Sequence, residues 1–218
     1  MHSILEFLKT LHSTQGIEQI IASGGLVVLV GIVFAETGLL AGFFFPGDSL
    51  LVTAGFLASR GITSSEPLLN IYILNVCLMA AAICGDQFGF LLGRKTGPKI
   101  FDKPDNRFFK KKYAREAHQF YEKHGGKAII LARFVPIMRT FVPFIGGVAQ
   151  MKYSEYAPYS VVGGITWVAS MTLLGYFLGN SPWGEKIHLI VMVIVGISLL
   201  PMVIGLVKRF VWKEKVSL

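Results

Sequence analysis

Three long apolar stretches constrain this chain more than any other feature of its sequence. They cover residues 68–93, 156–178 and 187–207, and each is long enough to cross a lipid bilayer as a helix. Of the 218 residues, 53% are hydrophobic and 16% are charged, whereas the surface of a soluble domain of this size needs more charged side chains. We therefore expect an all-α integral membrane protein, because a spanning helix satisfies its own backbone hydrogen bonds inside the bilayer.

Two further apolar stretches, residues 26–57 and 127–151, are interrupted near their middles by proline, glycine and charged residues. Proline removes a backbone hydrogen bond, so neither stretch is expected to form one continuous helix. We interpret each stretch as a re-entrant hairpin that dips into the bilayer and returns to the side from which it came. The predicted backbone breaks that shape the two hairpins are Pro46, Gly47, Pro136, Pro143, Gly146 and Gly147.

The chain reads as two copies of one unit, a broken hairpin followed by a spanning helix. The first copy covers residues 25–93 and the second covers residues 128–180, and their spans close alike, with "FGFLLG" and "LGYFLG". Because each copy would cross the bilayer once, the second starts on the opposite side. This makes an inverted repeat whose hairpin tips meet near the midplane, with a last spanning helix, residues 187–207, after it. In the alternative topology, residues 26–45 span outright, and "GDSLLVTAGFLA" has to cross back with too few residues.

Positive charge predicts the orientation in the membrane. The formal net charge is +8, and residues 94–127 carry eleven lysines and arginines against four acidic residues. Cytoplasmic loops are rich in Lys and Arg, so we place this loop in the cytoplasm together with the basic tail, residues 208–218. The N-terminus then falls on the periplasmic side. Anionic lipid headgroups are sufficient partners for the basic loop, which lacks a nucleic-acid recognition motif, so we expect no nucleic-acid binding.

The start of the chain, residues 1–24, is predicted to be an amphipathic helix that lies in the membrane interface. Its apolar residues Ile4, Leu5, Leu8 and Leu11 fall on one helical face. A helix packed against the rest of the bundle is the alternative. The pattern of a cleaved signal peptide is missing here, so we expect none.

Cysteine and histidine offer no pattern for a metal or a cofactor. Cys77 and Cys84 lie seven residues apart in one apolar span, where packing is their simplest role. No two of the five histidines have the spacing of metal ligands on an apolar face. We expect neither a metal nor a cofactor.

Two arginines, Arg133 and Arg139, lie in the second broken stretch, in "ARFVPIMR". A charged side chain at the bilayer centre costs about 2.5–3.5 kcal/mol on insertion scales, so both must face protein, water or counter-charges. On a continuous helix they would point about 120° apart. Pro136 lies between them and allows a break that turns both guanidinium groups inward.

The first broken stretch offers the opposite charges. Glu36 and Asp48 lie twelve residues apart, and a turn in residues 42–47 would bring both to one tip. Two acids that face two arginines make a neutral set inside the bilayer, which we interpret as a functional site. The structural alternative is ion pairs that hold the hairpins together, although desolvation offsets much of their attraction. A third acid, Asp86, could join this set, cap a helix end or pair with a basic residue such as Arg94.

Several of these motifs, in this order, resemble the DedA family, also called the SNARE-associated or VTT-domain family. The resemblance is carried by Glu36, by "PGD" at 46–48, by "GDQFGFLLGRKTG" at 85–97, and by "ARFVPIMR" at 132–139, followed by two glycines. It covers roughly residues 25–207.

The resemblance implies a bacterial inner-membrane protein with two opposed re-entrant hairpins whose acidic and arginine residues are required for function. Family members are linked to proton-motive-force-dependent physiology, to envelope integrity and, in some bacteria, to the return of undecaprenyl phosphate across the membrane. Related eukaryotic proteins scramble phospholipids. On this basis we expect a transporter of a phosphate-bearing lipid and not an enzyme. Arg133 and Arg139 would bind the phosphate, since guanidinium groups match phosphate oxygens, and Glu36 and Asp48 would couple transport to protons.

Other functions stay open on the sequence alone. The acids could bind a small cation or drug in a proton-coupled antiporter. A membrane phosphatase is disfavoured, because "PGDSL" lacks the glycine that a nucleophile elbow carries two residues after its serine, here Ser49. A purely structural role would use the same packing glycines and basic loop. Assembly as a homo-oligomer is also left open.

Overall fold

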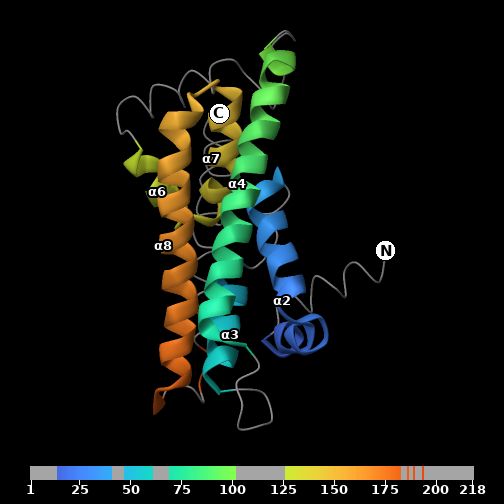
Figure 1. Cartoon of the computed structure of the whole chain (residues 1–218), viewed down its shortest axis with the longest axis vertical. Helices are drawn as coiled ribbons and strands as arrows, with labels where there is room; N and C mark the ends of the chain where they lie inside the picture. The colour runs from blue at the N-terminus through green and yellow to red at the C-terminus, as the bar shows by residue number, and fades with distance from the viewer. Residues whose placement is uncertain are drawn as a thin grey trace, which may run out of the picture.

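The computed structural model describes residues 14–40, 47–60, 69–101 and 126–182, with the single residues 186, 189 and 193. In these residues the chain forms six helices and no strand, which confirms the predicted all-α class (Figure 1). Outside the described residues lie more than half of the predicted interfacial helix, most of the basic loop, the predicted last span apart from residues 189 and 193, the basic tail and Pro46.

Two long helices, α4 (Ile71–Phe101) and α8 (Tyr153–Gly179), run antiparallel to each other (Figure 1). Both are long and apolar enough to cross a membrane, as expected for the first two predicted spans. α4 begins after Asn70, whose Oδ1 accepts hydrogen bonds from the backbone N–H groups of Tyr72 and Ile73, at 2.9 and 3.3 Å. This side chain satisfies donors that the start of a helix leaves free.

The first broken stretch forms two short helical segments, residues 25–38 and 47–60, that run in opposite directions. α2 (Thr14–Gly38) bends at Gly25, where the backbone adopts φ 55° and ψ −150°, and then runs beside α4. Its last residue, Gly38, packs against Gly85, near the middle of α4. α3 (Gly47–Arg60) then returns along α8. With 14 residues α3 is about 21 Å long, which is less than the roughly 30 Å of a bilayer core.

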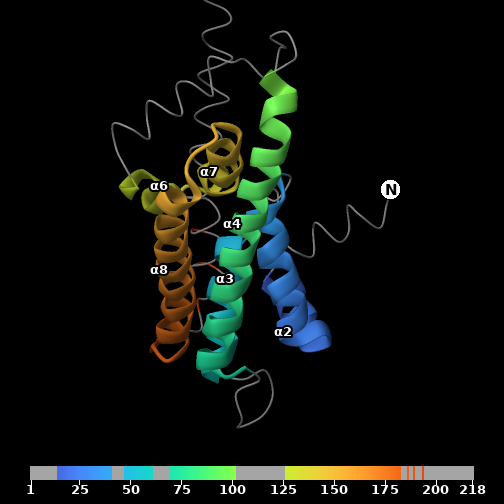
Figure 2. The ribbon, with the colours of Figure 1, turned by 45° about the horizontal axis from the view of Figure 1, so that its top comes forward.

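The second broken stretch also forms two short helices in opposite directions. α6 (Lys127–Ala132) runs beside the first part of α8, and α7 (Pro136–Val148) returns along α4. Between them the backbone is extended at Val135, with φ −110° and ψ 112°, and Pro136 begins α7, where a missing N–H costs little. Both views place α6 and α7 near the N-terminal end of α8, and α3 nearer the C-terminal end of α8 (Figure 2).

α7 is continuous where the sequence predicts further breaks. Pro143, Gly146 and Gly147 all lie inside this helix, so the prediction of backbone breaks at these three residues is wrong. Gly147 is instead a packing residue, because a Cβ there would collide with the carbonyl oxygen of Phe90 in α4. Pro143 faces Gly89 of α4, where an added Cβ would lie 3.5 Å from the Cβ of Pro143.

Glycines set the closest contacts between the long and the short helices. Where α3 meets α8, a Cβ at Gly55 would collide with the carbonyl oxygen of Thr172, and one at Gly175 would collide with that of Val52. α4 and α7 approach as closely at Gly93. Small residues of this kind hold helices together in lipid, where apolar burial supplies little driving force. Each long helix therefore packs against one short helix from each broken stretch.

Large apolar side chains cover the outside of the two long helices. Tyr72, Val76 and Leu91 are exposed on α4, and Leu174 and Phe177 are exposed on α8. In water, apolar surface on this scale would promote aggregation. In a bilayer the same side chains contact lipid tails, so the outer surface fits a lipid environment.

We predict that Gly175→Ala destabilises the contact between α3 and α8, because the added methyl group collides with the backbone at Val52. Overpacking of this kind costs about 1–3 kcal/mol, so the melting temperature of the purified protein in detergent should fall. Gly31→Ala is the matched control, since nothing lies within 4 Å of its added Cβ and alanine favours a helix. Equal melting temperatures for the two variants would contradict this packing.

Candidate functional site

Five charged side chains are buried where the short helices come together. Glu36, Asp48 and Asp86 are at most 6% exposed, and Arg133 and Arg139 are at most 3% exposed. The arginines flank the turn between α6 and α7, the first two acids flank the connection between α2 and α3, and the third acid lies near the middle of α4. Residues distant in the sequence thus become neighbours because the ends of the short helices meet.

Arg139 ties the two broken stretches together. Its Nη1 donates a hydrogen bond of 2.5 Å to Asp48 Oδ1, and its Nη2 donates to Glu36 Oε1. The guanidinium carbon lies 4.6 Å from the ring centroid of Trp167 in α8, and Trp167 Nε1 donates a hydrogen bond of 2.8 Å to the same oxygen of Asp48. Two carboxylates and one aromatic face thus hold both terminal nitrogens of Arg139 in place.

The start of α3 accommodates this arrangement because residue 47 is glycine. A Cβ at Gly47 would collide with the carboxylate of Glu36. The next residue, Asp48, lies in the first turn of α3, where free backbone N–H groups favour a negative charge. Gly47 and Asp48 therefore let carboxylates from two different helices, α2 and α3, reach Arg139.

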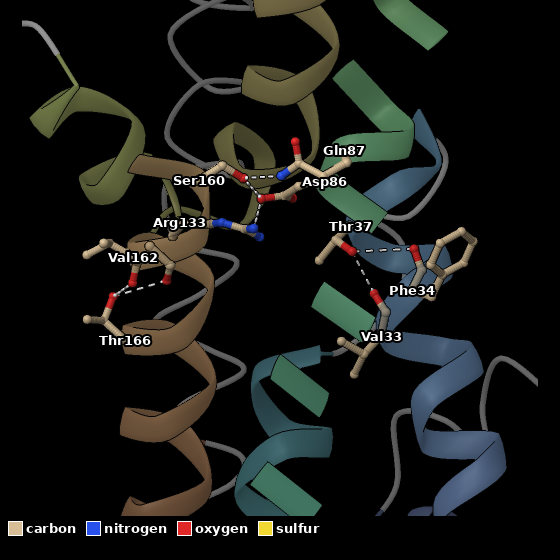
Figure 3. Close-up of polar contacts among 10 residues, drawn as sticks. Val33, Phe34, Thr37, Asp86, Gln87, Arg133, Ser160, Val162 and Thr166 are labelled. Atoms are coloured by element: carbon tan, nitrogen blue, oxygen red, sulfur yellow. Dashed lines mark hydrogen bonds and ion pairs between the residues drawn. The ribbon is translucent and has the colours of Figure 1, made fainter. Parts of the chain in front are cut away.

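Arg133 belongs to a second polar cluster, which consists of Arg133, Asp86, Ser160 and Gln87 (Figure 3). Its Nη2 forms an ion pair with Asp86 Oδ2. The same oxygen accepts a hydrogen bond of 2.5 Å from Ser160 Oγ, which in turn accepts one of 3.3 Å from Gln87 Nε2. The other terminal nitrogen, Arg133 Nη1, has no hydrogen-bond partner within the described part of the chain.

Two glycines of α8 make room for the Arg133 side chain. A Cβ at Gly163 would lie 3.0 Å from Arg133 Cγ, and one at Gly164 would lie 3.4 Å from Arg133 Nη2. On the same helix, the ring centroid of Trp167 lies 6.0 Å from the guanidinium carbon of Arg133. Trp167 is therefore a neighbour of both arginines.

The five charges named from the sequence come together, but their pairing differs from the prediction. The sequence predicts that Glu36 and Asp48 face both arginines, whereas in the structure both contact Arg139. Of the roles that the sequence allows for Asp86, the structure shows it in the buried polar set, paired with Arg133. The arginines have different partners because the turn between α6 and α7 separates them.

Ser160 and Trp167 complete the site, and the sequence interpretation missed both. Together with Gly163 and Gly164, they recur at intervals of three and four residues along α8, which places them on one helical face. A strip of small and polar residues on an otherwise apolar span is the signal that could have identified them.

The buried set holds three carboxylates against two guanidinium groups. Its formal charge is −1 when all five groups are ionised, so one proton or one cation would neutralise it. The guanidinium groups, in contrast, offer donors to an oxyanion such as phosphate. Among the described residues, no three His, Cys, Asp or Glu side chains are grouped to hold a metal ion.

We predict that Arg139→Gln destabilises the fold by about 3–5 kcal/mol, because it leaves two buried carboxylates without their cation. Adding Glu36→Gln should recover part of this loss, since it removes one of the two buried carboxylates that have lost the guanidinium group of Arg139. Melting temperatures of the wild type, the two single variants and the double variant in detergent form a double-mutant cycle. Strictly additive losses would contradict a direct contact between the two side chains.

The VTT domain family matches residues 45–177 of this chain. Protein DedA of Escherichia coli (strain K12) is 41% identical over 213 residues, which cover 96% of this chain and 94% of that protein. An uncharacterized membrane protein of Mycobacterium tuberculosis (strain ATCC 25618 / H37Rv) is 48% identical over 185 residues, which cover 83% of this chain and 79% of that protein.

Inner membrane protein YqjA of Escherichia coli (strain K12) is 34% identical over 155 residues, which cover 71% of this chain and 68% of that protein. No solved structure matches the chain. The matched domain contains Asp48, Asp86 and both buried arginines, and Glu36 lies shortly before it. A match over more than half of the chain, with a relative 41% identical over 96% of it, shows that this chain is a membrane protein of the VTT-domain family, also known as the DedA family.

Proposed function

We propose that this protein transports a phosphate-bearing lipid across the inner membrane of a bacterium, with undecaprenyl phosphate as the first candidate substrate. The observation that carries the proposal is Arg133, which is 2% exposed and whose Nη1 lacks a hydrogen-bond partner among the described residues. An unused buried donor is costly, and an oxyanion from a substrate would satisfy it. The inner membrane is proposed because the relative YqjA is named an inner membrane protein.

In this proposal the two broken stretches are re-entrant hairpins of an inverted repeat. The short lengths of α3 and α7 support hairpins that turn back inside the bilayer. The packing supports the repeat, since α3 lies on α8 in the way that α7 lies on α4. The two helix pairs point in opposite directions, because α4 and α8 are antiparallel. The charged centre would then lie near the midplane, where transporters with broken helices bind their substrates.

A phosphate headgroup suits this centre, and a lipid tail suits its surroundings. Guanidinium groups contact two phosphate oxygens at once, and such contacts strengthen where water is excluded. The exposed apolar faces of α4 and α8 would leave the isoprenoid or acyl tail in the bilayer while the headgroup passes between the hairpins.

Glu36 and Asp48 are proposed to couple this movement to protons. Both hold Arg139, so protonation of either carboxyl group would weaken that contact and free a guanidinium nitrogen for the substrate. The charge count supports this role, because one proton neutralises a set of three carboxylates and two arginines. Proton entry would then be linked to headgroup transfer.

The same excess of one carboxylate favours a second candidate, a proton-coupled antiporter of small cations or drugs. In that case Glu36, Asp48 and Asp86 would alternate between a proton and the cation, and the arginines would tune their charge. Accumulation of a labelled cation in vesicles, with and without a proton gradient, distinguishes this candidate from lipid transport.

We predict that the wild-type protein speeds the transbilayer movement of undecaprenyl phosphate in proteoliposomes. Arg133→Gln should reduce the rate at least about tenfold, because a hydrogen bond to a charged group contributes about 1.5–3 kcal/mol and each ~1.4 kcal/mol is a factor of ten in rate. Arg94→Gln is the control, since it removes an equal charge from an exposed position.

Folding and orientation in the vesicles are to be matched by detergent melting and by protease protection before rates are compared. No movement by folded wild-type protein, with or without a proton gradient, would contradict the proposal for this lipid. Cation accumulation under the same gradient would then favour the antiporter.

A further inference from the structure

The two buried arginines differ in the number of carboxylates that they contact inside the protein. Arg139 has a carboxylate on each of its terminal nitrogens. Arg133 has one carboxylate, from Asp86, and its Nη1 has no hydrogen-bond partner in the described residues. At 2% exposure, Arg133 is also shielded from bulk water. Within the described residues Arg139 also has an unused donor, its Nε, but both of its terminal nitrogens are taken, so Arg133 is the arginine with a terminal nitrogen ready for an incoming ligand.

Asp86 contacts this arginine in a way that permits exchange. Its Oδ2 forms the ion pair with Arg133 and accepts the hydrogen bond from Ser160, while its Oδ1 has no hydrogen-bond partner among the described residues. A contact through one oxygen is weaker than a fork-to-fork pair between guanidinium and carboxylate. Figure 3 shows the order of the chain of contacts, from Gln87 through Ser160 and Asp86 to Arg133.

We infer that Asp86 is an internal competitor of the substrate, whose carboxylate occupies on Arg133 the place that a phosphate oxygen takes during transport. The inference rests on the proposed function and adds a residue that sets affinity at the same site. Carboxylate and phosphate are both oxyanions that match the guanidinium group. A phosphate monoester can contact Nη1 and Nη2 together, which Asp86 does not do.

The exchange would proceed in two steps. One phosphate oxygen binds the unused Nη1 of Arg133, and a second oxygen then displaces Asp86 from Nη2. The displaced carboxylate keeps its hydrogen bond from Ser160, so it stays beside Arg133 and takes Nη2 back as the headgroup leaves. Asp86 thereby keeps binding weak enough for release, which any transport site requires.

The test measures the binding of farnesyl phosphate, a short isoprenoid phosphate, to the purified protein in detergent by calorimetry. Asp86→Asn keeps the shape of the side chain and removes the competing charge. We expect its Kd for farnesyl phosphate to fall at least about tenfold below that of the wild type, as the loss of a charged competitor implies. Its Kd for farnesol, which has the same tail and no phosphate, should not change.

A second pair of variants keeps the test valid if Asp86→Asn folds poorly. Ser160→Ala removes the hydroxyl group that positions Asp86, and we expect a Kd about threefold lower. Ser170→Ala makes the same change at an exposed serine of α8 and should leave the Kd unchanged. In proteoliposomes, Asp86→Asn should also lower both KM and kcat, because tighter binding slows release.

Two other results are informative. Equal or weaker binding of farnesyl phosphate by Asp86→Asn and Ser160→Ala, together with loss of binding in Arg133→Gln, would overturn the inference and leave the proposed function intact. If the folded wild type and these variants bind farnesyl phosphate no better than farnesol, the proposed substrate class fails, and the inference fails with it.

Discussion

A guanidinium group inside a bilayer has to find its counter-charges within the protein, and the arrangement of this fold follows from how Arg139 finds them. Its partners, Glu36 and Asp48, belong to the other broken stretch, so their contacts form only when the ends of α2, α3 and α7 meet. Neither stretch can neutralise its own charges. The same contact that joins the two halves of the fold therefore creates the charged centre on which the proposed function depends.

Glycines make this meeting sterically possible. Gly38 and Gly85 let the end of α2 approach the middle of α4, and Gly163 gives Arg133 a place against α8. Close backbone contacts thus set how near each short helix lies to a long helix, and these positions determine where the charges lie. The same small residues thus allow the close helix packing and leave room for the buried charged side chains.

Much of this fold is predictable from the sequence, because apolar length and buried charge are strong constraints in a membrane. The two long helices and the five buried charges follow from these constraints. The partner of each arginine does not, since it depends on the turn at Val135 and on how α4 and α8 face each other. The continuous course of α7 through Pro143 is also unpredictable from local propensity, because tertiary packing overrides it.

The account depends most on the two broken stretches reaching the charged centre from opposite sides of the membrane. In a chain with Cys77 and Cys84 replaced by alanine, single cysteines at the exposed positions Asn70, Lys127 and Asn180 can be labelled from either side with a membrane-impermeant maleimide. The account predicts that Lys127→Cys is labelled only from the cytoplasm, and Asn70→Cys and Asn180→Cys only from the periplasm. Labelling of Asn70→Cys and Lys127→Cys from the same side would contradict it.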